Sequence, residues 1–168
     1  MTLVGHSLLG LSLGALAIPR GWSRRPKLLA FGVFGLLAGG PDLPAPLWGH
    51  SRYLISHSIF VNLGLIAGVA ALAAASPRLR GALGGWPLVC AGAAAWLSHL
   101  LLDSFYSHGN GVRIFWPLSR DVLSLPMPWF DVLHVGAPPD VALKIFAVEF
   151  AFYGSLFGLC LLWRARQR

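Results

Sequence analysis

Long apolar runs alternate with short polar connections along most of the chain. The runs are rich in Leu, Ala and Gly and lack the period-two alternation of a half-buried strand, so each predicts a helix. They cover residues 2–19, 27–40, 57–75, 86–105 and 141–163. A helix needs about 20 residues to cross a bilayer, and the run that ends before Pro41 is short. The pattern predicts an all-α, polytopic membrane bundle of about five apolar segments, the second short or half-spanning.

Composition supports the membrane class. Hydrophobic residues make up 56% of the 168 residues and charged residues 11%, whereas a soluble domain has about 25% charged residues. A net charge of +7 would suggest nucleic-acid binding if it formed a basic patch, but these charges lie between apolar runs. We expect one membrane-embedded domain, with residues 106–140 as an interfacial loop before the last run.

The basic residues predict an orientation. Nine of the 13 Lys and Arg residues lie in the first connection, the third connection and the tail: Arg20, Arg24, Arg25, Lys27, Arg78, Arg80, Arg164, Arg166 and Arg168. Five spans bring all of these to one side, which the positive-inside rule makes cytoplasmic. The N-terminus is then outside and the C-terminus inside, in a bacterial or archaeal cytoplasmic membrane.

Histidines and carboxylates follow the opposite distribution. On this topology, all six His and all six acidic residues fall on the outer side or in the outer half: His6, Asp42, His50, His57, His99, Asp103, His108, Asp121, Asp131, His134, Asp140 and Glu149. Ionisable groups within a membrane are costly unless they are paired or functional. The one-sided collection therefore predicts a functional site at the outer end.

His99 and Asp103 are the first candidates for metal binding. At i and i+4 they share a helix face and could grip one ion, or His99 could simply bond Asp103 in a polar seam. His6 and His57 lie at the lip of their runs. They are either further ligands or hydrogen-bond partners between helices.

Three further groups of residues leave alternatives open. Asp42 follows Gly39-Gly40-Pro41, where it could ligate metal, act as a general base or be an ordinary turn aspartate. Glu149 is a ligand, an acid supporting a ligand, or the counter-ion of an arginine such as Arg113. His50 and His108 rank lower as ligands.

Several short motifs, taken together, resemble a known family. In order they are Gly5-His6-Ser7, Gly40-Pro41-Asp42, Ser56-His57-Ser58, His99-Leu-Leu-Leu-Asp103 and Gly111-Val-Arg-Ile-Phe-Trp-Pro117-Leu-Ser119. They resemble the YdjM-like (DUF457) family of predicted membrane-bound metal-dependent hydrolases, regarded as distantly similar to zinc-dependent phospholipase C. The resemblance implies phosphoester hydrolysis. Two positions depart from the family pattern. Pro44 stands where the family has a second acid. Arg52 stands where the family has a histidine, and the nearest histidine, His50, lies two residues upstream.

These observations lead to one hypothesis with two rivals. The predicted ligands of one or two divalent ions are His6, Asp42, His57, His99 and Asp103. Zinc suits these donors best, with manganese or iron possible; Asp42 completes the site or takes a proton, and Arg52 or Arg113 holds a phosphate. The partner is membrane lipid, and the substrate is lipid-like or a phosphoester. The rivals are a small transporter or proton-handling protein, which needs polar groups at several depths, and a scaffold that binds no metal.

Overall fold

The chain folds into helices, and the longest connection between them covers residues 106–138. The computed structural model describes residues 1–106, 111–125, 127, 131–133 and 136–167, with His50 and Ser51 described by their backbone. Its elements are α1 (Leu3–Ala17), α2 (Arg24–Ala38), η1 (Gly40–Asp42), η2 (Gly49–Arg52), α3 (Tyr53–Ser56), α4 (Ile59–Ala75), α5 (Pro77–Ala82), α6 (Trp86–Phe105) and α7 (Pro139–Arg166). The described residues contain no strand, and Val112 and Leu123 form an isolated bridge. The all-α class is confirmed.

Each of the five predicted runs forms one long helix. The second helix ends at Ala38, before Pro41, as expected. The third begins two residues later than predicted, because Ser58 has an extended backbone and its hydroxyl caps the helix by accepting from the Val61 N–H. His57 therefore lies just before α4 and not within it. The predicted boundary at residue 57 was wrong for this reason.

Helix length bears on the number of membrane spans. Among the described residues, α6 and α7 are long and apolar enough to cross a membrane, while α1 and α4 are shorter apolar helices. These two have 15 and 17 residues, against the roughly 20 that a full crossing needs. The expected count of five spans stays a prediction.

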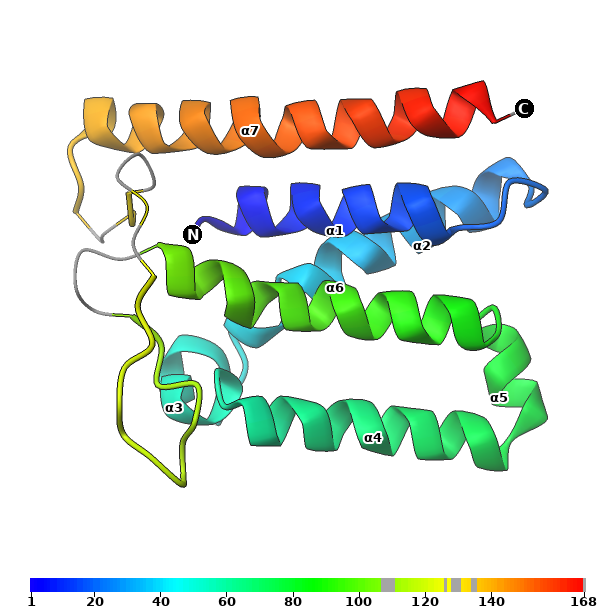
Figure 1. The fold of residues 1–168 in the computed structure, drawn as a ribbon, viewed down its shortest axis with the longest axis horizontal. Helices are drawn as coiled ribbons and strands as arrows, with labels where there is room; N and C mark the ends of the chain where they lie inside the picture. The colour runs from blue at the N-terminus through cyan, green and yellow to red at the C-terminus, as the bar shows by residue number, and fades with distance from the viewer. Residues whose placement is uncertain (107–110, 126, 128–130, 134–135, 168) are drawn as a thin grey trace.

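The first helix is central in the bundle. It packs against α2, α6 and α7, and α4 lies on the other side of α6 (Figure 1). A cluster formed by Ile18, Phe34, Leu88 and Ala95 is buried between the connection after α1, α2 and α6. Gly10 of α1 permits close contact with α2, because a Cβ at this position would lie 2.2 Å from the carbonyl oxygen of Phe34.

The bundle has two chemically different ends. The N-terminus, α3 and residues 111–125 lie at one end, and the α1–α2 connection, α5 and the C-terminal end of α7 lie at the other (Figure 1). At the second, basic end, Arg164 donates to the carbonyl oxygen of Ala15 over 2.6 Å, and the Arg20 guanidinium lies 5.8 Å from the centre of the Trp163 ring. The structure thus separates the basic connections from the histidine-bearing end.

Candidate metal-binding site

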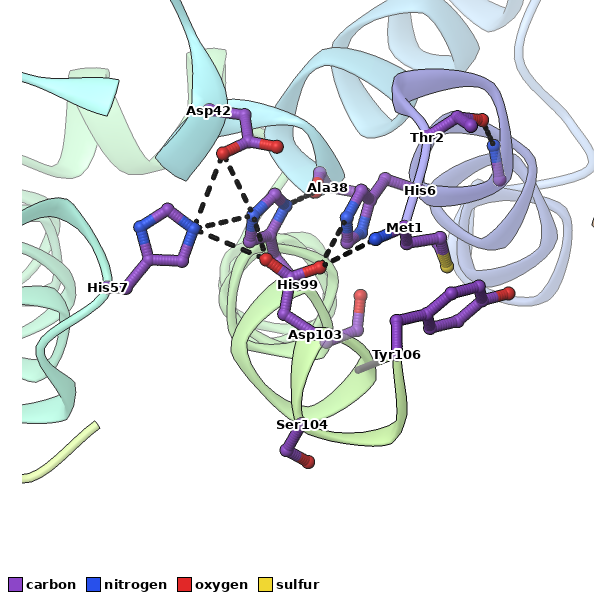
Figure 2. Close-up of polar contacts among 12 residues, drawn as sticks. Met1, Thr2, His6, Ala38, Asp42, His57, His99, Asp103, Ser104 and Tyr106 are labelled. Atoms are coloured by element: carbon purple, nitrogen blue, oxygen red, sulfur yellow. Dashed lines mark hydrogen bonds and ion pairs between the residues drawn. The ribbon is translucent and has the colours of Figure 1, made fainter. Parts of the chain in front are cut away.

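Five side chains from separate parts of the chain meet at the end opposite the basic one. His6 comes from α1, Asp42 from η1, His57 from the junction of α3 and α4, and His99 and Asp103 from α6 (Figure 2). The three histidines are at most 1% exposed. All five residues that the sequence predicted as metal ligands are therefore brought together.

Four donor atoms form a compact group. His57 Nε2 lies 3.3 Å from Asp42 Oδ1, 3.3 Å from Asp103 Oδ2 and 3.2 Å from His99 Nε2. His99 Nε2 lies 3.4 Å from Asp103 Oδ2 and 3.7 Å from Asp42 Oδ1. Two donors that each lie about 2.0–2.1 Å from a tetrahedral ion are about 3.3 Å apart. The five distances given above are close to this value.

His6 extends the group on the other side of Asp103. Its Nε2 lies 3.1 Å from Asp103 Oδ1, the oxygen that does not face His57, and its ring stacks on His99 with centroids 3.7 Å apart. The Met1 amine is 3.4 Å from the same oxygen. Ligand atoms of His6, Asp42, His99 and Asp103 all lie within 4.8 Å of one another, so these residues could hold a metal ion. Asp103 offers one oxygen to each side.

Contacts behind the imidazoles fix which nitrogen faces the centre. His99 Nδ1 lies 2.9 Å from the carbonyl oxygen of Ala38, and since a carbonyl only accepts, this nitrogen carries the proton. His57 Nδ1 lies 2.8 Å from Ser56 Oγ, whose hydroxyl can donate to Gly49 O at 3.2 Å. In that arrangement both rings turn an Nε2 acceptor toward the two carboxylates. Such a centre needs positive charge, which a proton or a metal ion supplies.

Asp42 is poised as a ligand in its charged form. Burial would raise the pKa of its carboxyl, but the imidazoles of His57 and His99, when protonated, outweigh burial and hold this pKa well below its usual range. Metal ligands must be deprotonated to bind. Asp42 therefore meets that condition at neutral pH.

A tight turn delivers Asp42 to the site. Gly40 packs on Trp96 of α6 so closely that a Cβ would lie 2.3 Å from the indole ring. The Trp48 indole N–H donates to the Gly40 carbonyl oxygen over 2.8 Å. The Gly-Pro-Asp sequence thus ends α2 and folds the carboxylate against α6.

Asn62 is a site-forming residue that the sequence reasoning missed. Its buried amide donates to the carbonyl oxygens of Ser56 at 2.8 Å and Ser58 at 2.7 Å, on either side of His57. Its own oxygen accepts from the Trp96 indole. The available signal was a single amide in an otherwise apolar run, where a polar side chain needs a partner.

The motif at residues 111–119 supports the same junction. The Ile59 N–H donates to the Ile114 carbonyl oxygen over 2.8 Å, and the Ser58 hydroxyl donates to the Trp116 carbonyl oxygen. This segment therefore packs beside His57 and adds none of the five clustered side chains.

The remaining candidates have other partners, are exposed or lie outside the described residues. Glu149 is buried in α7, where its carboxylate accepts from the Thr2 N–H at 2.9 Å and from the Thr2 hydroxyl. It anchors the start of α1, a role that differs from those predicted. Arg52 and Arg113 have exposed side chains. The His50 side chain and His108 lie outside the described residues.

The fold and the site together define a class: an all-helical protein with long apolar helices and a buried His/Asp group at one end. Family comparison agrees with this class. The chain belongs to the family of YdjM inner membrane proteins, whose model matches residues 1–167, so it is a membrane protein. No curated protein and no solved structure matches the chain.

Proposed function

We propose that this protein is a membrane-bound, metal-dependent hydrolase that acts on phosphoesters. The observation that carries the proposal is the compact group of four donor atoms from His57, His99, Asp42 and Asp103, with five separations of 3.2–3.7 Å. Two imidazoles and two carboxylates form a donor set that suits zinc, with manganese or iron as alternatives. The second oxygen of Asp103, together with His6, offers donors for a second ion.

The five residues divide the work between binding and proton transfer. A bound divalent ion would activate water and polarise the scissile phosphoester. His57 and His99 would hold it through Nε2, with their Nδ1 atoms engaged by Ser56 and Ala38. The Asp42 side chain is 15% exposed, compared with 10% for Asp103. Because it is the more accessible carboxylate, we assign it the proton-accepting role. His57, His99 and Asp103 would then hold the ion and leave its fourth position open to water.

Exposed cations at the same end of the molecule would bind the substrate. Arg52 lies in η2, next to the turn that carries Asp42, and Arg113 lies beside the bridged Val112. A guanidinium binds phosphate through paired N–H donors. We propose that one of these two arginines holds the phosphate of the substrate.

The proposed orientation places this chemistry outside the cytoplasm. The basic connections lie at the end opposite the cluster (Figure 1), and a positive-inside arrangement makes that end cytoplasmic. With five membrane-crossing segments, the cluster lies at the outer interface, where a substrate with an apolar part would arrive from the lipid.

Metal content tests the proposal first. We expect purified protein to contain a divalent ion by elemental analysis, and His99→Ala and Asp103→Ala to lose most of it. Asp121→Ala is the control, because Asp121 is exposed and pairs with Ser119 in the loop. Full metal content in both site variants would contradict the ligand assignment.

Activity tests it second. The wild type should hydrolyse members of a phosphoester panel, lose this activity with a chelator and regain it when the ion is returned. Asp42→Asn should remove most turnover. A metal-loaded protein that is inactive on the whole panel would overturn the hydrolase proposal while leaving the metal site in place.

A further inference from the structure

A cavity lies between helices that carry or adjoin the cluster. Its volume is about 680 Å³, and it is walled by α2, α4, α5 and α6 together with Trp22. Every lining residue is apolar or glycine, as Val33, Leu65, Ala93 and Trp96 illustrate. This volume falls within the roughly 300–1,000 Å³ typical of small-molecule sites, but the walls offer no hydrogen bonds to a polar ligand.

The cavity and the metal-binding cluster share their walls. The second helix leads through η1 to Asp42, α4 follows directly after His57, and α6 carries His99. Trp96 lines the cavity one helical turn before His99 and contacts the turn at Gly40. The apolar space therefore begins where the polar cluster ends, along the same helices.

The distance from the far end of the cavity to the cluster is that of a lipid chain. On α6 the lining extends back to Leu88, eleven residues before His99, which is about 16 Å at 1.5 Å per residue. The hydrocarbon core of a bilayer is about 30 Å thick, so an acyl chain of one leaflet spans about 15 Å. Trp22, Ala82 and Leu83 line the space toward the basic end.

We propose that this cavity binds the hydrocarbon chain of a lipid phosphate whose head group lies at the His/Asp cluster. The inference rests on the proposed function and names its substrate class. An amphiphile has the same order of polarity as the site: charged groups at one end and apolar walls along the rest. The indole N–H of Trp96, at the boundary, already donates to Asn62, so the wall that faces the chain is apolar there too.

Binding is tested without relying on turnover. The protein in phosphatidylcholine vesicles is irradiated with a long-chain alkyl phosphate that carries a diazirine at the end of its chain. We expect labelled peptides to come from the cavity walls on α2, α4 and α6, and an excess of unlabelled long-chain alkyl phosphate to suppress the labelling. Labelling spread equally over the lipid-facing surface of α7, or insensitive to the competitor, would overturn the inference.

A matched pair of variants tests the same cavity through hydrolysis. Ala93 lines the cavity, whereas its neighbour Ala94 is exposed and outside the lining. Ala93→Phe should lower long-chain labelling and long-chain phosphoester hydrolysis about tenfold or more, with metal content and short-chain hydrolysis unchanged. Ala94→Phe should behave as wild type. Equal effects of the two variants would overturn the inference.

The two proposals can fail separately. Cavity labelling in a protein that hydrolyses nothing would sustain the lipid site and refute the hydrolase. Hydrolysis of short- and long-chain phosphoesters with equal efficiency, and no cavity labelling, would sustain the hydrolase and refute the lipid site.

Discussion

At the scale of single residues, the cluster depends on atoms that would not touch an ion. The Ala38 carbonyl and the Ser56 hydroxyl engage the outer nitrogens of His99 and His57, and this contact aims each inner nitrogen at the carboxylates. Partners of this kind typically change metal affinity by about 10–100-fold. The orientation of the rings is therefore as much a part of the site as their identity.

Removing one such partner should weaken metal binding while sparing the fold. Ser56→Ala takes away the hydroxyl that holds the His57 ring, so we expect metal affinity, measured by competition with a chelating dye, to fall about tenfold. Ser98→Ala is the matched control, because its hydroxyl donates to Ala95 within α6. Equal affinity of the two variants would contradict the assigned role of Ser56.

Sequence alone identified the five clustered residues better than it identified their supports. His99 and Asp103 were predictable as a pair because helical spacing fixes their common face. The role of Glu149 was not, because its partner Thr2 lies 147 positions away and depends on how α7 packs on α1. Asn62 was equally hidden, since its bonds to Ser56 and Trp96 join elements whose contact no local pattern encodes.

At the scale of elements, close glycine contacts and the hydrogen bonds of the Asn62 side chain set the positions of the helices that carry the cluster. Gly10 brings α1 against α2, and Gly40 brings the η1 turn against α6. The predicted runs located all the long helices, because long apolar stretches without alternation are helical. The short elements between residues 40 and 58 were not predicted, since their geometry comes from Pro41, Ser58 and contacts with α6.

Adding one methyl group at the α1–α2 contact should destabilise the bundle. At Gly10 the new Cβ meets the Phe34 carbonyl oxygen at 2.2 Å, and such overpacking typically costs about 1–3 kcal/mol of unfolding free energy. At Gly32, on α2, a Cβ meets nothing within 4 Å, so Gly32→Ala should be neutral or stabilise by up to about 1 kcal/mol. Thermal unfolding in detergent measures both, and a Gly10→Ala variant as stable as Gly32→Ala would refute the contact.

Asn62→Leu should loosen the junction that holds His57. The change removes the side-chain partner of the Ser56 carbonyl oxygen and of the Trp96 indole N–H, whereas the Ser58 carbonyl oxygen still accepts from the backbone N–H of residue 62. Each unsatisfied buried group costs about 1–3 kcal/mol. We expect a lower melting temperature and a lower metal affinity than in the control Leu63→Ala, which alters an exposed side chain on the same helix. An Asn62→Leu variant with wild-type affinity would show that the amide is dispensable.

At the scale of the whole molecule, charge is separated along the bundle axis. Arginine-rich connections occupy one end and the histidine cluster the other (Figure 1). This separation was predictable, because alternating apolar runs force successive connections to opposite ends. The sequence did not predict which helices become neighbours, and the central position of α1 is seen only in the packed structure.

The predicted orientation can be tested with single cysteines. After Cys90 and Cys160 are replaced by Ala, Leu118→Cys introduces a thiol at the cluster end, where Leu118 is 79% exposed. Gly81→Cys introduces one at the basic end, in α5. A membrane-impermeant maleimide should label the first in intact cells and the second only after permeabilisation. Labelling of both from the same side would refute the proposed topology.

The donor atoms come from three helical elements and the α3–α4 junction, from His6 in α1 to Asp103 in α6, and this has a consequence for biogenesis. A nascent chain cannot assemble this group of donor atoms until the first helix has docked against one that emerges much later from the ribosome. Ion loading would then mark completed assembly. At a free-ion concentration of a hundred times the dissociation constant, binding would raise the free energy of unfolding by about 2.7 kcal/mol. Metal scarcity should accordingly shorten the lifetime of the protein in the membrane, as a misassembled bundle is left open to quality-control proteases.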